Sequence, residues 1–203
     1  MYYYQHNIAD FNNATRHLTR VERSLYRDMI EMYYDKEQPL PLDENQLFRR
    51  VLAISDEEKQ AVKNVLADFF VRSDDGWRHE RCDAEIEAYH AKRLEDVAEA
   101  LRGNHFDAHV VADADAARDL VLGRIVPETA PATVSFGGSM TLVATGLPAA
   151  LAARPGLTVL DTMDKSIAPA AMYERRRQAL LVDLFLTGTN AVTEDGVLVN
   201  LDM

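Results

Sequence analysis

Cysteine is almost absent from this chain, since Cys82 is the only one among 203 residues. No disulfide can therefore form within one chain, and no cluster of cysteine thiolates can hold a metal ion there. Cys82 begins a predicted helix, a position that would lower the pKa of its thiol, but no neighbouring residue marks it as a nucleophile. We interpret it as a passive thiol and expect neither a catalytic cysteine nor a bound metal.

Long apolar runs are also missing. No stretch approaches the length that a bilayer-spanning helix needs, and the opening residues MYYYQHNIAD have neither the basic segment nor the apolar core of a signal peptide. We expect a cytoplasmic protein without membrane contact. Hydrophobic residues make up 47% of the chain, enough for the core of one ordinary domain or of two small ones.

Positive charge is scarce as well. The chain has 22 Lys and Arg residues against 33 Asp and Glu residues, which gives a net charge of −11. This balance argues against a general affinity for nucleic acid or for anionic membranes. Any site for a polyanion must therefore be a local patch.

One long helix is predicted over residues 82–103, CDAEIEAYHAKRLEDVAEALRG. Its apolar residues recur every three to four positions, and Gly103 followed by Asn104 is typical of a left-handed helix end. Before this helix the sequence is rich in predicted helices, whereas after it short β-branched runs alternate with helical runs. We place a domain boundary within the helix and predict domains at residues 1–88 and 89–203.

The first half predicts three helices followed by a hairpin. After an extended segment and a turn over residues 2–15, capping-box sequences begin helices after Thr19 and after Ser55, and Asp43 caps a short helix between them. Asp75 and Gly76 separate two short extended runs, a strong hairpin signal. This order is that of a winged helix, which commonly places its third helix in the DNA major groove and its hairpin on the DNA backbone.

Basic side chains of this half are candidates for DNA contacts. They are Arg16, Arg20, Arg23, Arg27, Lys59, Lys63 and Arg78. Three acids, Asp56, Glu57 and Glu58, stand at the start of the third helix, where they would repel phosphate. Arginines beside acids usually form a solvated, ion-paired helix face, so charge alone leaves both interpretations open.

A family resemblance covers this half. The run DFNNATRHLTRVERSLYRDMIEMYYDKEQPLP, together with DDGWRHERCDAEI, resembles the N-terminal domain of YdaU-type prophage proteins and phage replication-initiator-like proteins over about residues 1–90. The resemblance implies a role in phage DNA replication, through binding of origin DNA or of a replication protein. It assigns no catalytic residue, and the basic linker and C-terminal domain that usually follow are not found in this sequence.

The second half predicts strands that alternate with helices. Strands are expected at residues 106–111, 132–138, 157–161, 184–190 and 196–200, and helices at 113–125, 139–154 and 168–183. Such alternation indicates a parallel sheet covered on both faces. Ligands of these sheets bind beyond the carboxyl ends of the strands.

Two loops follow strand ends in this half. FGGSMT, residues 136–141, has paired glycines that let the backbone come close to a ligand, and TGTNAVTEDG, residues 187–196, is dense in hydroxyl and amide side chains. Each is also an ordinary turn sequence. Neither loop alone decides between a ligand site and a plain turn.

Together, GGSMT and LTGTNAVTEDGVLVN resemble the LUD domain of lactate-utilisation proteins of the LutC/YkgG kind, from about Tyr89 to Met203. The resemblance implies a fold similar to ribose-5-phosphate isomerase and CoA-transferases, and a role in oxidising lactate alongside iron–sulfur partner proteins. A LUD domain normally continues with further strands and helices, so we expect a truncated sheet that either self-associates through its C-terminal strands or leaves the second half partly disordered. Carried over by position, the candidate ligand-binding residues are Gly137, Gly138, Ser139, Thr141, Thr189, Asn190, Glu194 and Asp195.

The sequence thus predicts a two-part α + α/β fold. A winged-helix-like helical domain is joined by a long helix to a truncated, Rossmann-like parallel-sheet domain. The expected function is a DNA- or replisome-binding module fused to an incomplete LUD domain, and the alternative is a component of lactate oxidation. We expect no cofactor and no self-sufficient catalytic activity. The expected partners are DNA or a replication protein for the first half, a small anionic ligand for the second, and another copy of the chain.

Overall fold

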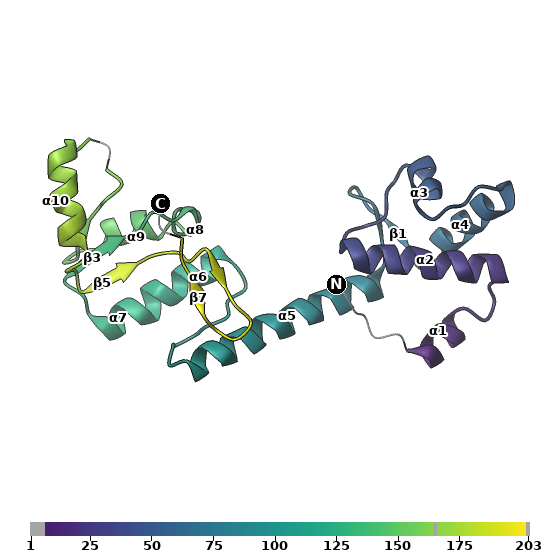
Figure 1. The fold of residues 1–203 in the computed structure, drawn as a ribbon, viewed down its shortest axis with the longest axis horizontal. Coiled ribbons are helices and arrows are strands. Elements are labelled where there is room, and N and C mark those ends of the chain that lie inside the picture. The colour runs from purple at the N-terminus through teal and green to yellow at the C-terminus, as the bar shows by residue number, and fades with distance from the viewer. Residues whose placement is uncertain (1–6, 165, 202–203) are drawn as a thin grey trace. The chain divides into compact units, whose positions relative to one another are not determined.

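The computed structural model describes residues 7–164 and 166–201. The chain divides into two compact units, residues 1–93 and 94–203, and the division falls inside one continuous helix, α5 (Glu80–Gly103) (Figure 1). Each unit has its own cluster of buried hydrophobic residues. Of the helices in the described ranges, none combines the length and the apolarity that crossing a bilayer requires.

The N-terminal unit is helical, with one small hairpin. Its elements are α1 (Ile8–Ala14), α2 (Arg20–Lys36), α3 (Glu44–Arg50), α4 (Asp56–Phe69), β1 (Val71–Arg72), β2 (Trp77–Arg78) and the first part of α5. Both capping boxes are present: the Thr19 and Ser55 side chains accept the backbone N–H of Glu22 and Glu58, whose carboxylates accept the N-cap N–H groups in return. Asp43 caps α3 as predicted.

The expected extended segment and turn near the N-terminus are wrong for residues 8–14, which form α1. Asn7 caps this helix, because its Oδ1 accepts the backbone N–H of Ala9 at 3.1 Å and of Asp10 at 3.2 Å. The Phe11 ring is buried and stacks on Tyr26 of α2 with 5.8 Å between ring centroids. Residues 2–6 of the predicted extended segment lie outside the described residues.

Helix α2 supplies the centre of the N-terminal core. Met29 and Tyr33 are fully buried on it and pack in one cluster with Leu47 of α3 and Val62 and Val65 of α4. The predicted hairpin is confirmed, with Val71 opposite Arg78. Leu40, ahead of α3, exchanges two backbone hydrogen bonds with Trp77, of 2.9 and 2.8 Å. This isolated antiparallel bridge connects the segment before α3 to strand β2 of the hairpin.

The C-terminal unit contains a small parallel sheet with helices against it. After α5 come α6 (Ala114–Leu120), a π-helical turn (Val121–Ile125), α7 (Val126–Thr129), β3 (Thr133–Phe136), α8 (Met140–Ala144), α9 (Leu147–Ala152), β4 (Thr158–Leu160), α10 (Pro169–Ala179), β5 (Leu184–Leu186), β6 (Ala191–Val192) and β7 (Leu198–Val199). The parallel strand order is β4-β3-β5. Val134 and Phe136 of β3 are buried in one cluster with Leu147 and Leu151 of α9.

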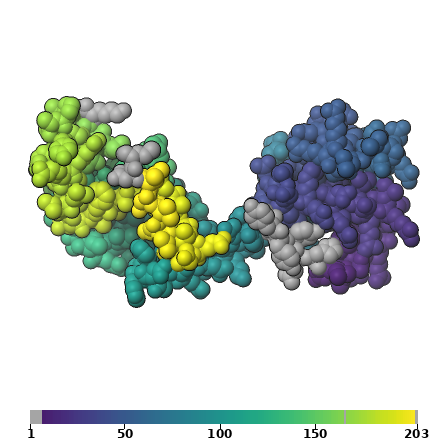
Figure 2. All heavy atoms as spheres, viewed as in Figure 1, coloured from purple at the N-terminus to yellow at the C-terminus, as the bar shows by residue number. Residues whose placement is uncertain are grey.

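One strand prediction in this unit is wrong, and another strand is present but lies outside the parallel sheet. Residues 106–111 form no strand, and Phe106 stays 44% exposed, because no strand of the described residues lies alongside to accept their backbone hydrogen bonds. The strand predicted at 196–200 exists as β7, but it pairs antiparallel with β6 in a separate ribbon instead of extending the parallel sheet. Figure 2 shows this ribbon, in yellow, against the C-terminal end of α5.

Candidate functional site

The carboxyl ends of three parallel strands lie side by side in the C-terminal unit. Central strand β3 ends at Phe136 and pairs in register with β5, Phe136 lying opposite Leu186, and with β4, Ser135 lying opposite Leu160. The segments that follow the three strands begin at Gly137, Asp161 and Thr187. We define these segments as the strand-end site, the position where ligands bind in parallel α/β sheets.

The loops after β3 and β5 pack directly on each other. The Gly137 N–H donates to the Leu186 carbonyl at 2.8 Å, and a Cβ atom on Gly137 would overlap the Thr187 hydroxyl. A Cβ atom on Gly188 would lie 2.6 Å from Ser139 Oγ. A side chain at position 137 or 188 would therefore have to displace Thr187 or Ser139 from the packing between the two loops.

Gly138 differs from both of these glycines. It is exposed, and no atom lies within 4 Å of the position that a Cβ would take. The next residue, Ser139, caps α8 by accepting the Leu142 N–H at 3.3 Å, and Thr141 is exposed on the first turn of that helix. Gly138 and Thr141 are thus the open positions of the first loop, whereas Gly137 and Ser139 hold its shape.

Sequence reasoning missed the third segment, which follows β4. The Thr162 hydroxyl donates to the Phe136 carbonyl at 2.8 Å and so ties the ends of β4 and β3 together. From α10, half-buried Arg175 donates to the Asp161 carbonyl at 3.4 Å, which brings a guanidinium to the same strand end. The only sequence signal for this segment was its position after a predicted parallel strand.

The predicted residues of the second loop shape the β6–β7 ribbon. The Thr189 hydroxyl donates to the Val199 carbonyl at 3.1 Å, and Asn190 Oδ1 accepts the Leu201 N–H at 2.8 Å. The Asp195 carboxylate accepts from the Thr193 hydroxyl, and its carbonyl accepts from Asn104 at 3.0 Å.

Glu194 is exposed in the turn of the same ribbon. Gly196 there packs on α5 so closely that a Cβ would lie 2.6 Å from the Ala100 carbonyl carbon. The hydrogen bonds of Thr189, Asn190 and Asp195 described above therefore build the ribbon.

Most of the basic residues predicted to contact DNA are engaged by protein groups. Arg23 and Arg27 lie over the Phe11 ring, 5.1 and 5.2 Å from its centroid, and Arg23 also donates to Asn12. On α4, Lys63 pairs with Glu44 at 2.9 Å and Lys59 with Asp56 at 3.7 Å.

The hairpin residue Arg78 pairs with Asp75 and, at 3.4 Å, with Asp83. Arg16 and Arg20 are exposed, and within the described ranges neither has an acidic partner. The surface around the hairpin and α4 is thus a largely ion-paired face.

Cys82 is buried in the first turn of α5, next to a network of polar groups. His79 Nδ1 accepts the Cys82 N–H at 3.3 Å and so caps the helix, while His79 Nε2 lies 2.9 Å from the Tyr26 hydroxyl. Burial raises the pKa of the Cys82 thiol to about 12, which corrects the expectation of a lowered pKa and supports the passive thiol. Among the described residues, no group of three or more His, Cys, Asp or Glu side chains has a geometry that could hold a metal ion.

Two family models match successive parts of the chain. One, described as "Protein of unknown function (DUF1376)", covers residues 2–87, and the other, the LUD domain, covers residues 94–203. No curated protein and no solved structure matches the chain. The description of the first model assigns no function, so the resemblance to YdaU-type and replication-initiator-like domains stays a prediction.

Proposed function

We propose that this chain, which belongs to the LUD domain family through residues 94–203, binds a small carboxylate of the lactate type at the strand-end site and acts in lactate utilisation. The observation that carries the proposal is the convergence of three strand-end segments, with an exposed, unobstructed glycine at position 138. A backbone without a side chain lets a ligand come close enough to meet N–H groups.

The side chains at the strand-end site suit a 2-hydroxy carboxylate. Thr187 offers a hydroxyl next to Gly137, Thr141 offers one on the first turn of α8, and Arg175 offers a guanidinium beside Asp161. A guanidinium and backbone N–H groups stabilise a carboxylate, while threonine hydroxyls can donate to and accept from an alcohol. Lactate carries both groups on adjacent carbons, which supports it over an anion without a hydroxyl.

In this proposal, partner proteins carry the electrons that are released when lactate is oxidised. The single cysteine is buried and cannot assemble an iron–sulfur cluster within one chain. The resemblance to lactate-utilisation proteins favours iron–sulfur proteins as those partners. The strand-end site then contributes binding and orientation of the substrate.

A thermal-shift titration tests the proposal. Ligands that bind the folded state raise the melting temperature, so lactate should raise it. Phosphosugars and acyl-CoA compounds are titrated in parallel as alternative ligand classes. Gly138→Ala should remove the shift, because its methyl group occupies the open space. Gly123→Ala, at another position with open surroundings, is the matched control and should keep it. A flat response to lactate in the unmodified chain would contradict the proposal.

A further inference from the structure

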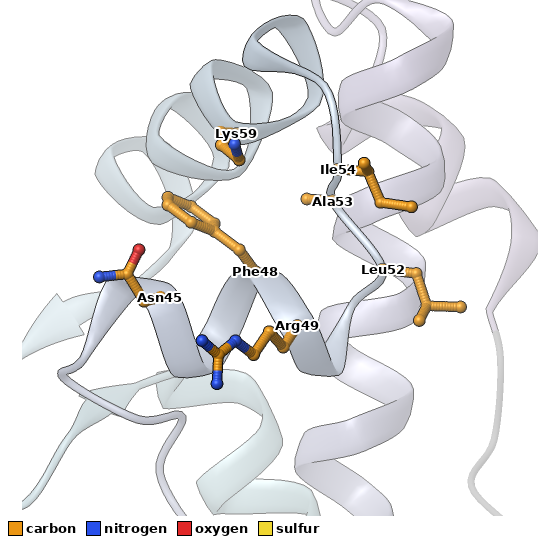
Figure 3. A pocket seen from close by; sticks show the side chains of 7 residues that line it. All are labelled: Asn45, Phe48, Arg49, Leu52, Ala53, Ile54 and Lys59. Atoms are coloured by element: carbon orange, nitrogen blue, oxygen red, sulfur yellow. The ribbon is translucent and has the colours of Figure 1, made fainter.

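A groove opens between α3 and α4 in the N-terminal unit, with a volume of about 430 Å³. Its apolar lining comes from Phe48 of α3 and from Leu52, Ala53 and Ile54 of the connecting loop, and its polar lining includes Arg49 and Lys59. Figure 3 shows the Leu52 and Ile54 side chains projecting from the loop, while Phe48 points between the two helices. The groove therefore combines an aromatic floor with aliphatic and cationic edges.

Leu52 and Ile54 leave most of their surface in water. Leu52 is 76% exposed and Ile54 81% exposed, although the intervening Ala53 is buried. Hydrophobic groups gain free energy by leaving water, so two adjacent exposed aliphatic side chains at a groove are typical of a contact surface.

The loop that carries these two side chains is held by hydrogen bonds. The Ala53 N–H donates to the Phe48 carbonyl at 2.8 Å, and the N–H groups of Ile54 and Ser55 donate to the Glu58 carboxylate at 2.9 and 2.8 Å. A preformed loop loses little conformational entropy on binding. The exposed side chains are thus presented in a fixed position.

Leu52 has a backbone conformation that its residue type disfavours. Its φ is +58°, in the left-handed region where glycine or asparagine is commonly found after a helix. The Leu52 side chain also contributes little to the core, since most of it is exposed. The fold at this position would be served better by glycine, which indicates that the leucine side chain has a role outside the core.

The charge around the groove is unequal. Arg49 has no acidic partner among residues 7–164 and 166–201, and Lys59 has only a 3.7 Å contact with Asp56, whose side chain is fully exposed. Asp56 and Glu57 lie next to Ile54, at the start of α4. The α3 side of the groove therefore carries the positive charge of Arg49, whereas the α4 side carries both signs, Asp56 and Glu57 beside Lys59.

We propose that this groove docks a short segment of a partner protein that carries a bulky apolar side chain with Asp or Glu residues on one side only. The apolar side chain packs against the exposed Leu52 and Ile54, and the acids lie toward Arg49. Phosphate of a DNA backbone fits this surface less well, because the aliphatic side chains offer it no hydrogen bonds and Asp56 and Glu57 repel it. The inference is independent of the function proposed for residues 94–203.

Selection from a library of random peptides displayed on phage, with the full chain immobilised, tests the proposal. Peptides with a bulky apolar residue and acids on one flank should be enriched, and a synthetic copy should bind in fluorescence anisotropy. Leu52→Gly combined with Ile54→Ser should weaken that binding at least about tenfold, the size of effect typical of an anchor side chain. Arg49→Glu should weaken it too and should favour peptides with basic flanks.

Two controls separate a docking role from a structural one. Leu52→Gly relieves the left-handed strain, so its melting temperature should equal or exceed that of the unmodified chain. Val71→Ser removes another exposed aliphatic side chain of the same unit and should leave peptide affinity unchanged. Enrichment of peptides without this pattern, retention of affinity in the double variant, or displacement of the peptide by duplex DNA at equal concentration would each overturn the proposal.

Discussion

The Tyr26 hydroxyl and His79 Nε2 lie 2.9 Å apart in the core of the N-terminal unit. On its other side, His79 accepts the Cys82 N–H through Nδ1, so this nitrogen must be unprotonated and Nε2 carries the proton that is donated to Tyr26. The neutral ring therefore joins α2 to the first turn of α5. A second proton would remove the Nδ1 acceptor and place a positive charge in a buried site.

The first prediction concerns pH. Burial, followed by the positive charge of Arg81, lowers the pKa of His79 below its usual 6.5, although Asp83 and Glu85 oppose the shift. The unfolded chain then binds a proton more readily than the folded one. The stability that neutral His79 contributes should therefore be fully present above about pH 6.5, and the free energy of unfolding should decrease as the pH falls below that value. Urea denaturation at pH 7 and pH 5.5 measures the loss.

The variant for this experiment is His79→Gln, which should lower stability at pH 7 and reduce the fall between the two pH values. An equal fall in the His79→Gln variant would exclude this histidine as its cause.

The second prediction concerns two tyrosines of α2. The Tyr33 hydroxyl donates to Asp83 and the Tyr34 hydroxyl to Glu85, both at 2.6 Å, and burial raises the pKa of both phenols. Each Tyr→Phe change should cost about 1.5 to 3 kcal/mol of unfolding free energy, because hydrogen bonds to carboxylates are stronger than neutral ones. Tyr173→Phe, at an exposed position, is the control, and chemical denaturation is the measurement. Equal stability of all three variants would contradict the prediction.

The third prediction concerns the capping boxes. Thr19→Ala and Ser55→Ala should each cost about 1 kcal/mol, because each leaves a helix N-terminus without its side-chain acceptor. Ser24→Ala, at an exposed position inside α2, should be neutral or slightly stabilising, since alanine favours helix. A loss at Ser24 as large as that at Thr19 would mean that capping is not the cause.

The fourth prediction separates the glycines of the strand-end site. Gly188→Ala places a methyl group against Ser139 and should cost about 1 to 3 kcal/mol, the usual range for overpacking, whereas Gly138→Ala should be close to neutral. Amide exchange at residues 184–189 reports the difference locally. Equal protection in both variants would show that the two loops do not pack as described.

The sequence predicted those features that depend on neighbours along the chain. The starts of α2, α3, α4 and α6 were predicted because a cap acts within three residues of itself, as Asp113 does for Ala116. The strand at 106–111 was wrong because β-branched residues form a strand only beside another one. The antiparallel pairing of β7 could not be predicted for the same reason, since its partner is chosen by the tertiary fold.

The features of the candidate site that sequence reasoning missed likewise depend on contacts between residues that are distant along the chain. The sequence alone does not distinguish Gly137 from Gly138. In the structure, a Cβ atom on Gly137 would meet Thr187, whereas a Cβ atom on Gly138 would lie in open space. Thr162 and Arg175 were missed because their strand-end contacts are nonlocal, and Leu52 was missed because its residue type gives no sign of a left-handed backbone. The winged-helix comparison, DNA binding, self-association and the domain limits 1–88 and 89–203 stay predictions.

Lactate binding at the strand-end site is the central claim, and an NMR titration of the isotope-labelled full chain with lactate tests it most directly. Saturable amide shifts should concentrate at Gly138, Thr141 and Thr187, and Gly138→Ala should abolish them while Gly123→Ala preserves them. Absence of saturable shifts, or shifts confined to residues away from the ends of β3, β4 and β5, would contradict the claim.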